Sequence, residues 1–248
     1  MANTLRTLVG RTLNVFGLRR VARKIEYALR PKRFRPDSEV TLEAVGRAIE
    51  MVTGTGLAEK GDYYEFGIYR GYTLWHAQQV MKRLGNSTMR VVGFDSFQGF
   101  PEVQGVDAYK GDFSEGQFAA GLEYVRGMLT EHGIDWERTI LVPGFFQDSL
   151  SDETKRKHAM KPAAVVLIDC VLYESTKLAL AWLCDLLVDG SILVFDDWNA
   201  FDRDEDRGER RAFREFLAAH PEWEATELFD YGVYGKAFRV ATRVREPA

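Results

Sequence analysis

The stretch that decides the fold is YYEFGIYRGYT, residues 63–73. It joins a short β-prone run, residues 63–66, to two glycines four residues apart, and a helical pattern of apolar residues follows over 74–84. A strand that runs through a glycine-rich turn into a helix is the repeating unit of a doubly wound α/β sheet. Ligands of such sheets bind beyond the carboxyl ends of the strands, so this turn is the first candidate binding site.

An acidic residue distinguishes this turn from a dinucleotide-binding turn. The pattern is E-x-G-x-x-x-G, whereas dinucleotide sites use G-x-G-x-x-G and hold a pyrophosphate on bare backbone amides. A carboxylate repels phosphate and suits a cationic ligand, and S-adenosylmethionine carries both an ammonium and a sulfonium group. We therefore predict an S-adenosylmethionine site, although glycines can also mark a simple turn. The candidate cofactor residues in this stretch are Glu65, Gly67, Tyr69, Gly71 and Thr73.

Strand and helix patterns alternate along the rest of the chain. Strands are expected over 90–94, 139–142, 163–168 and 191–195, and helices over 41–52, 74–84, 116–133, 178–187 and 209–219. Strict alternation predicts a parallel sheet with helices on both faces. Two closing strands, 224–229 and 236–242, surround a turn and are expected to pair antiparallel. The predicted class is α/β, a doubly wound Rossmann-like sheet that is mostly parallel with one antiparallel strand.

Polar residues follow the second and third predicted strands. Asp95 and Ser96 come directly after the second strand, where a carboxylate can accept both ribose hydroxyls. Capping of a local turn is the alternative for both residues. Phe146 and Gln147 come shortly after the third strand, where an aromatic ring and an amide could cover and bind an adenine. The alternative is that the phenylalanine belongs to the core.

Three carboxylates follow the fourth and fifth predicted strands. Asp169 ends the fourth strand, and Asp196 and Asp197 end the fifth. These strands should be neighbours, so the three acids should converge, and clustered carboxylates repel one another unless a cation or proton intervenes. Oxygen ligands of this kind suit Mg²⁺, which could chelate an acceptor hydroxyl. The alternative is that one aspartate contacts cofactor and another caps a helix.

The composition and net charge of the chain argue against a nucleic-acid-binding or membrane-spanning protein. The 248 residues include 46% hydrophobic and 28% charged residues with a net charge of −4, which gives no electrostatic case for a nucleic-acid partner. No apolar run is long enough to span a membrane. Cys170 and Cys184 lie in apolar runs, and the scattered histidines form no grouping with them that predicts zinc. A reducing cytoplasm is the expected location.

The N-terminal residues 1–36 form a separate segment. They are rich in arginine and lysine, opposed only by Glu26, and their apolar residues recur at helical spacing. Prolines flank the junction, so we expect a helical extension over 1–36 and one main domain over 37–248. Three roles remain open for the extension. It could pack on the domain or on a second subunit, act as a lid, or contact an anionic membrane surface.

Several motifs together resemble the macrocin O-methyltransferase family. They are YEFG at 64–67 with Gly71, DSFxGFP at 95–101, LYEST at 172–176, the pair Asp196-Asp197, and Gly208 with Ala212. The resemblance implies a class I methyltransferase fold, S-adenosylmethionine, and methylation of sugar hydroxyls on small natural products. It also implies Mg²⁺ bound by Asp169, Asp196 and Asp197, and a homo-oligomer in which N-terminal helices help to cover the site.

One position departs from the family pattern. The family has D-G-D before LYEST, and the second acid is thought to serve as general base or to support the metal; here the segment is Asp169-Cys170-Val171. Valine can do neither. The candidates for the proton acceptor are therefore Asp169 and, among other acids, Glu174. Alternatively, the chain is a methyltransferase-like binding protein with an impaired site, or a Rossmann-type nucleotide or NAD enzyme.

Overall fold

A computed structural model describes residues 34–110 and 112–243. The helical extension predicted over 1–36, and its role as lid, subunit contact or membrane contact, therefore lies outside the described residues except for 34–36. No helix in the described part of the chain is both long enough and apolar enough to cross a membrane.

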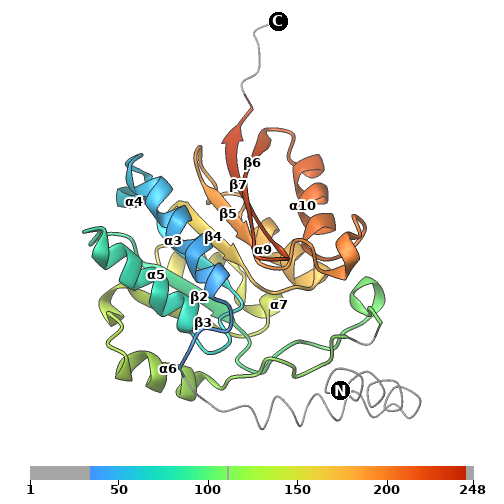
Figure 1. The fold of residues 1–248 in the computed structure, drawn as a ribbon, viewed down its shortest axis with the longest axis horizontal. Coiled ribbons are helices and arrows are strands. Elements are labelled where there is room, and N and C mark those ends of the chain that lie inside the picture. Colours follow the sequence, from blue (N-terminus) through green and yellow to red (C-terminus); the bar gives the residue numbers. More distant parts are fainter. Residues whose placement is uncertain (1–33, 111, 244–248) are drawn as a thin grey trace, which may run out of the picture.

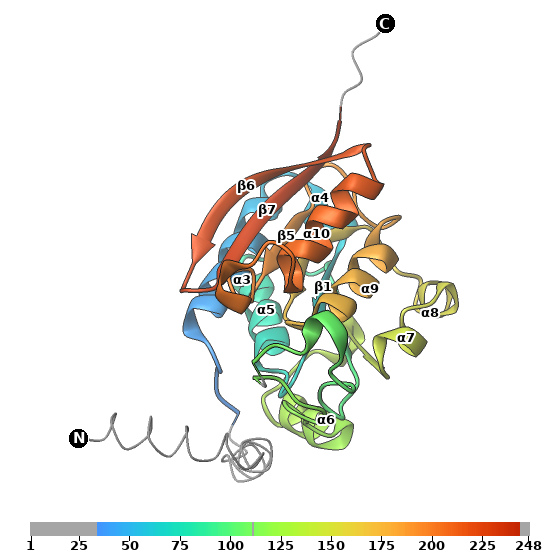
Figure 2. The same cartoon turned by 90° about the vertical axis from the view of Figure 1, so that its right-hand side faces the viewer.

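Seven strands form one sheet in the order β3-β2-β1-β4-β5-β7-β6 (Figures 1 and 2). Neighbours among β1 to β5 pair parallel, β7 pairs antiparallel with β5, and β6 pairs antiparallel with β7. The predicted mostly parallel sheet is confirmed. The strands are β1 (Asp62–Phe66), β2 (Val91–Asp95), β3 (Thr139–Pro143), β4 (Ala163–Ile168), β5 (Ile192–Phe195), β6 (Trp223–Tyr231) and β7 (Gly235–Thr242).

Helices cover both faces of the sheet (Figure 2). On one face lie α3 (Glu39–Thr53), α5 (Tyr72–Arg83) and α6 (Leu122–Glu131), with the short α4 (Leu57–Lys60) between α3 and β1. On the other lie α7 (Phe146–Ser149), α9 (Tyr173–Leu183) and α10 (Gly208–Ala219), with α8 (Asp152–Lys157) beside them. The central strands β1 and β4 are buried along their whole length, as expected for parallel strands covered on both faces.

Two predicted helices have different bounds in the structure. The helix predicted over 116–133 begins only at Leu122, because Gly116 and Phe118 adopt positive φ values of 74° and 61° that a helix cannot contain. The helix predicted over 178–187 is α9, which begins five residues earlier, at Tyr173. The Asp107 carboxylate accepts hydrogen bonds from the amides of Tyr173 and Glu174, at 2.6 and 3.2 Å, and so caps α9 from a distant part of the chain.

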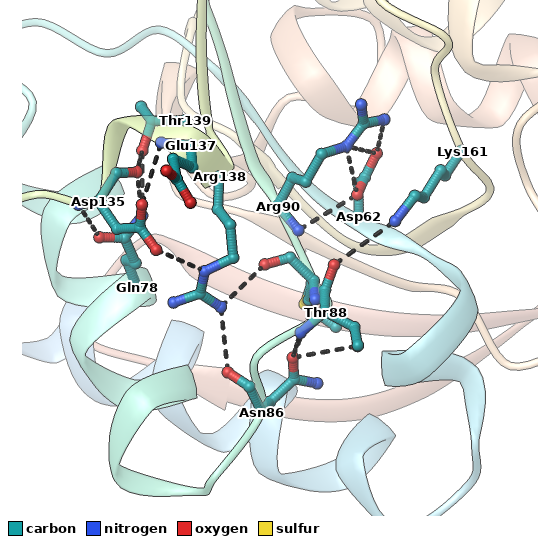
Figure 3. A network of polar contacts seen from close by, with 11 residues as sticks. Asp62, Gln78, Asn86, Thr88, Arg90, Asp135, Glu137, Arg138, Thr139 and Lys161 are labelled. Carbon is teal, nitrogen blue, oxygen red and sulfur yellow. Dashed lines mark hydrogen bonds and ion pairs between the residues drawn. The ribbon is translucent and has the colours of Figure 1, made fainter.

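A polar network closes the amino-terminal edge of β1, β2 and β3 (Figure 3). Asp62 is fully buried, and its carboxylate pairs with the Arg90 guanidinium through Nη2 at 2.5 Å and Nε at 3.1 Å. Arg138 donates from Nε to the Asp135 carboxylate at 2.9 Å. At this edge, Asp62 is thus paired with Arg90 and Asp135 with Arg138. The cavity lies at the opposite edge, where the carboxyl ends of the strands meet.

Candidate active site

A cavity of about 440 Å³ lies at the carboxyl ends of the parallel strands. It is bounded by the turn after β1, the ends of β2, β4 and β5, and the start of α7. The predicted site residues that line it are Gly67, Tyr69, Thr73, Asp95, Ser96, Phe146, Gln147, Asp169, Asp196 and Asp197. The fold thus gathers most of the predicted residues, from five separate segments, around one space.

Three predicted residues do not line this cavity. Glu65 is 1% exposed and accepts a hydrogen bond of 2.7 Å from the Tyr63 hydroxyl, and burial raises the pKa of its carboxyl to about 8. Its side chain does not line the cavity, and its role toward a cofactor ammonium stays a prediction. Gly71 directly precedes α5, and a Cβ built on it would lie 3.1 Å from the Val125 side chain of α6. Glu174 is an exposed residue of α9 and does not line the cavity.

Asp95 holds the glycine turn against the end of β2. Its Oδ2 accepts hydrogen bonds from the amides of Ile68 and Tyr69, at 2.8 and 2.9 Å, and its Oδ1 accepts one from Phe97 at 2.6 Å. Burial raises the pKa of this carboxyl, and the three amides oppose that rise. The turn-capping interpretation of Asp95 is therefore correct, and the residue also lines the cavity.

Gly67 stands where the ends of β1 and β4 approach each other. Its φ is +96°, and a Cβ built on it would overlap the backbone carbonyl of Asp169. Backbone hydrogen bonds fix both sides of this approach: the Gly67 amide donates to Phe94 and the Asp169 amide donates to Phe66, each at 2.9 Å. Only glycine fits here, so the turn presents bare backbone to the cavity.

The carboxylates of Asp169, Asp196 and Asp197 converge as predicted. One oxygen from each lies within 4.8 Å of the others. Burial raises the pKa of all three carboxyls, and the charges of the neighbouring acids add to the rise at Asp169 and Asp197; the pKa of Asp197 reaches about 7. Such a group of oxygen donors needs protons or a cation to neutralise it, and it fits a divalent ion such as Mg²⁺.

Residues that the sequence did not single out orient this cluster. Asp196 Oδ1 accepts hydrogen bonds from the Thr41 hydroxyl of α3 at 2.6 Å and the Tyr231 hydroxyl of β6 at 3.1 Å. Glu209, at the start of α10, accepts a hydrogen bond from the Asp197 amide at 3.0 Å. Its other oxygen is buried and has no hydrogen-bond partner among the described residues, and burial raises the pKa of its carboxyl well above the usual range.

An apolar wall borders the carboxylate cluster. Val171 has a φ of +59°, unusual for a β-branched residue, and the amide of Leu172 reaches back to the carbonyl of Cys170 at 2.5 Å in a tight turn. The valine side chain packs with Leu172 and Phe201, near Phe100. The turn at 169–172 therefore contributes one acid, Asp169, to the cavity wall, and the aliphatic side chain of Val171 lies next to it.

Comparisons with known proteins agree on one family. The family model described as macrocin O-methyltransferase (TylF) matches residues 39–230. A Streptomyces olivaceus protein named 8-demethyl-8-(2,3-dimethoxy-alpha-L-rhamnosyl)-tetracenomycin-C 4'-O-methyltransferase is 31% identical over 163 residues. A Streptomyces niveus demethyldecarbamoylnovobiocin O-methyltransferase is 29% identical over 163 residues. Each match covers 63% of this chain and 59% of the relative.

Solved structures agree with the family match. The O-methyltransferase NovP superposes with a TM-score of 0.67 and 26% identity, covering 82% of this chain and 80% of its own. The calicheamicin methyltransferase CalS11 gives a TM-score of 0.65 and 25% identity, covering 79% of each chain. The predicted class I methyltransferase fold is confirmed.

Proposed function

This chain belongs to the macrocin O-methyltransferase family, and we propose that it is an S-adenosylmethionine-dependent O-methyltransferase of a hydroxylated, sugar-like small molecule. The observation that carries the proposal is the cavity, in which a bare glycine turn and a cluster of three carboxylates share one space. The names of the relatives support the acceptor class, since one is named for a 4'-hydroxyl methylation on a rhamnosylated compound.

The part of the cavity beside the glycine turn is the proposed binding site of the cofactor. S-adenosylmethionine, when bound, supplies the electrophilic methyl group. Gly67 lets the ligand approach the backbone closely, and Asp95 fixes the turn while its Oδ1, which accepts one backbone hydrogen bond, keeps an acceptor site for a ribose hydroxyl. Phe146 and Gln147 line the same cavity and would contact an adenine bound there, while the Phe146 ring also packs on Phe66 of the core.

The part of the cavity beside the three carboxylates is the proposed binding site of the acceptor. A divalent ion such as Mg²⁺ held by Asp169, Asp196 and Asp197 would lower the pKa of an acceptor hydroxyl. Thr41 and Tyr231 hold Asp196 in one orientation, so the oxygen that faces the cavity is fixed before an acceptor arrives. With valine at 171, the proton of the acceptor goes to Asp169 or to water.

Calorimetric titration with S-adenosylhomocysteine, with and without Mg²⁺, tests the proposal. We expect micromolar binding in both conditions, because the glycine turn and the carboxylates form different parts of the cavity. A parallel titration with NAD should give no heat, since the acid-containing turn lacks the pyrophosphate pattern. Failure of S-adenosylhomocysteine to bind in either condition would contradict the proposed function.

Substituting Asp95 by alanine should weaken S-adenosylhomocysteine binding by about 1–3 kcal/mol, roughly 5- to 150-fold, as for hydrogen bonds to a charged group. The substitution removes both the ribose acceptor and the anchor of the amides at 68 and 69. Asp148→Ala is the matched control, because Asp148 is exposed on α7 and does not line the cavity. Equal affinities of the two variants would remove Asp95 from the cofactor site.

A further inference from the structure

A buried arginine that the proposed function has not used lies in the glycine turn after β1. The side chain of Arg70 is only 6% exposed, and the residue lines the active-site cavity. Its Cζ lies 4.6 Å from the centroid of the Tyr69 ring, and its Nη1 lies 3.9 Å from Oδ1 of Asp37. That ion pair is too long for a hydrogen bond, and the guanidinium donates none to the residues that the structure describes.

The burial of this guanidinium indicates that it binds an anion. A guanidinium has five N–H donors, and a buried charge that lacks hydrogen bonds is costly. Because Arg70 lines the cavity, a ligand that enters the cavity can reach it and supply the missing acceptors.

The amino end of α5 is a second feature that attracts an anion at the same place. This helix of 12 residues begins at Tyr72, directly after Gly71, and no described side chain caps it. Its first backbone hydrogen bond runs from the Trp75 amide to the Gly71 carbonyl. The amides of residues 72–74 precede that bond and lie at the positive end of the helix dipole. Tyr72 and Thr73 also line the cavity, so a buried cation and an uncapped helix end border one part of it.

This part of the cavity lies across the sheet from the proposed adenine contacts. Phe146 belongs to α7, on the face of the sheet opposite to α3 and α5 (Figure 2). Asp95, the proposed ribose contact, ends β2 in the sheet layer between these helices. A cofactor that runs from the adenine contacts past Asp95 and Gly67 therefore brings its amino-acid group toward Arg70.

We propose that Arg70 and the amino end of α5 bind the carboxylate of the cofactor's methionyl group. This inference rests on the proposed dependence on S-adenosylmethionine. The two N–H groups on one edge of a guanidinium match the two oxygens of a carboxylate, and a helix amino end favours the same charge. The methionyl group carries its ammonium on the same carbon as its carboxylate. Asp37 lines the cavity beside Arg70, so the two side chains present both charges that complement this group.

A comparison of two ligands tests the inference in the full-length chain. S-adenosylhomocysteine carries the carboxylate, and its decarboxylated analogue keeps the ammonium and lacks the carboxylate. Calorimetry on the unaltered protein should show that the analogue binds about 10- to 100-fold more weakly, as for the loss of hydrogen bonds between charged groups. In Arg70→Met, the affinity for S-adenosylhomocysteine should fall by a similar factor, whereas the affinity for the analogue should hardly change.

Two further variants sharpen this comparison. Arg70→Lys keeps the charge without the planar fork, so its affinity for S-adenosylhomocysteine should lie between those of Arg70→Met and the unaltered protein. Arg83→Met is the matched control, because Arg83 is an exposed arginine in the last turn of the same helix and does not line the cavity. It should bind both ligands as the unaltered protein does.

The possible outcomes separate this inference from the proposed function. If Arg70→Met weakened both ligands equally, Arg70 would act on the fold, and the inference would be overturned while the function stood. Unchanged affinity for S-adenosylhomocysteine in Arg70→Met would overturn it as well, and would leave this cation for an anionic acceptor. If S-adenosylhomocysteine did not bind the unaltered protein, the proposed function and the inference would fall together.

Discussion

Asp196→Asn/Asp197→Asn is expected to reduce methyl transfer by about 10²-fold or more while leaving S-adenosylhomocysteine affinity nearly unchanged. Removing charge that stabilises a transition state costs a factor of this order. The two carboxylates belong to the acidic cluster, whereas Gly67, Asp95 and Phe146 supply the proposed cofactor contacts. S-adenosylhomocysteine release in the presence of rhamnoside acceptors measures turnover, and calorimetry measures binding.

The same double variant should change how stability depends on pH. In the metal-free chain, burial and the charge of Asp196 raise the pKa of Asp197 to about 7. Burial also raises the pKa of Asp196, and burial together with the neighbouring acids raises that of Asp169. A group whose pKa is raised by folding favours the folded state below its unfolded pKa, and this contribution is lost as the pH rises through the folded pKa. The melting temperature of the metal-free protein should therefore fall between about pH 4 and about pH 7.

Asparagine does not titrate, so the double variant should show a shallower fall. Mg²⁺ should restore the melting temperature of the unaltered protein above neutral pH and have little effect on the variant. Asp152→Asn/Glu153→Gln is the control, because it changes an adjacent, exposed acid pair on α8. Unchanged turnover of the double variant in the presence of a chelator would contradict a role for a metal ion in catalysis. Loss of S-adenosylhomocysteine binding would instead show that these acids contact the cofactor.

The sheet was predictable because its central strands are buried on both faces. The run at 163–168 is continuously apolar, and the structure has β4 over the same residues. Convergence of Asp169 with Asp196 and Asp197 was predictable for a related reason, since neighbouring parallel strands end at one edge of the sheet. Both predictions used only strand order and the position of each strand end.

The contacts that orient the site were not predictable, because they join distant parts of the chain. Thr41 and Asp196 are 155 residues apart, and Tyr231 and Asp196 are 35 apart. No local period or motif encodes such a pair. The burial of Glu65 was not predictable for a different reason: a strand buried on both faces lacks the apolar–polar alternation that would show how its side chains are placed.

Gly67→Ala is expected to abolish measurable S-adenosylhomocysteine binding and to lower the free energy of unfolding by about 2–4 kcal/mol. Two costs combine at this position. The φ of +96° is strained for any residue with a Cβ, and that Cβ would overlap the Asp169 carbonyl. Because both neighbouring strand ends are fixed by backbone hydrogen bonds, the clash can be relieved only by separating the ends of β1 and β4.

Gly85→Ala separates these two costs. Gly85 follows α5 with a similar φ of +74°, but a Cβ there would meet no atom within 4 Å. It should therefore cost only about 1–2 kcal/mol, the price of the left-handed conformation, and leave binding intact. Chemical denaturation and calorimetry on both variants give the comparison. If Gly67→Ala were no more damaging than Gly85→Ala, the strand ends would be able to part freely. Gly67 would then matter for its conformation alone, and not for the close approach that joins the turn after β1 to Asp169.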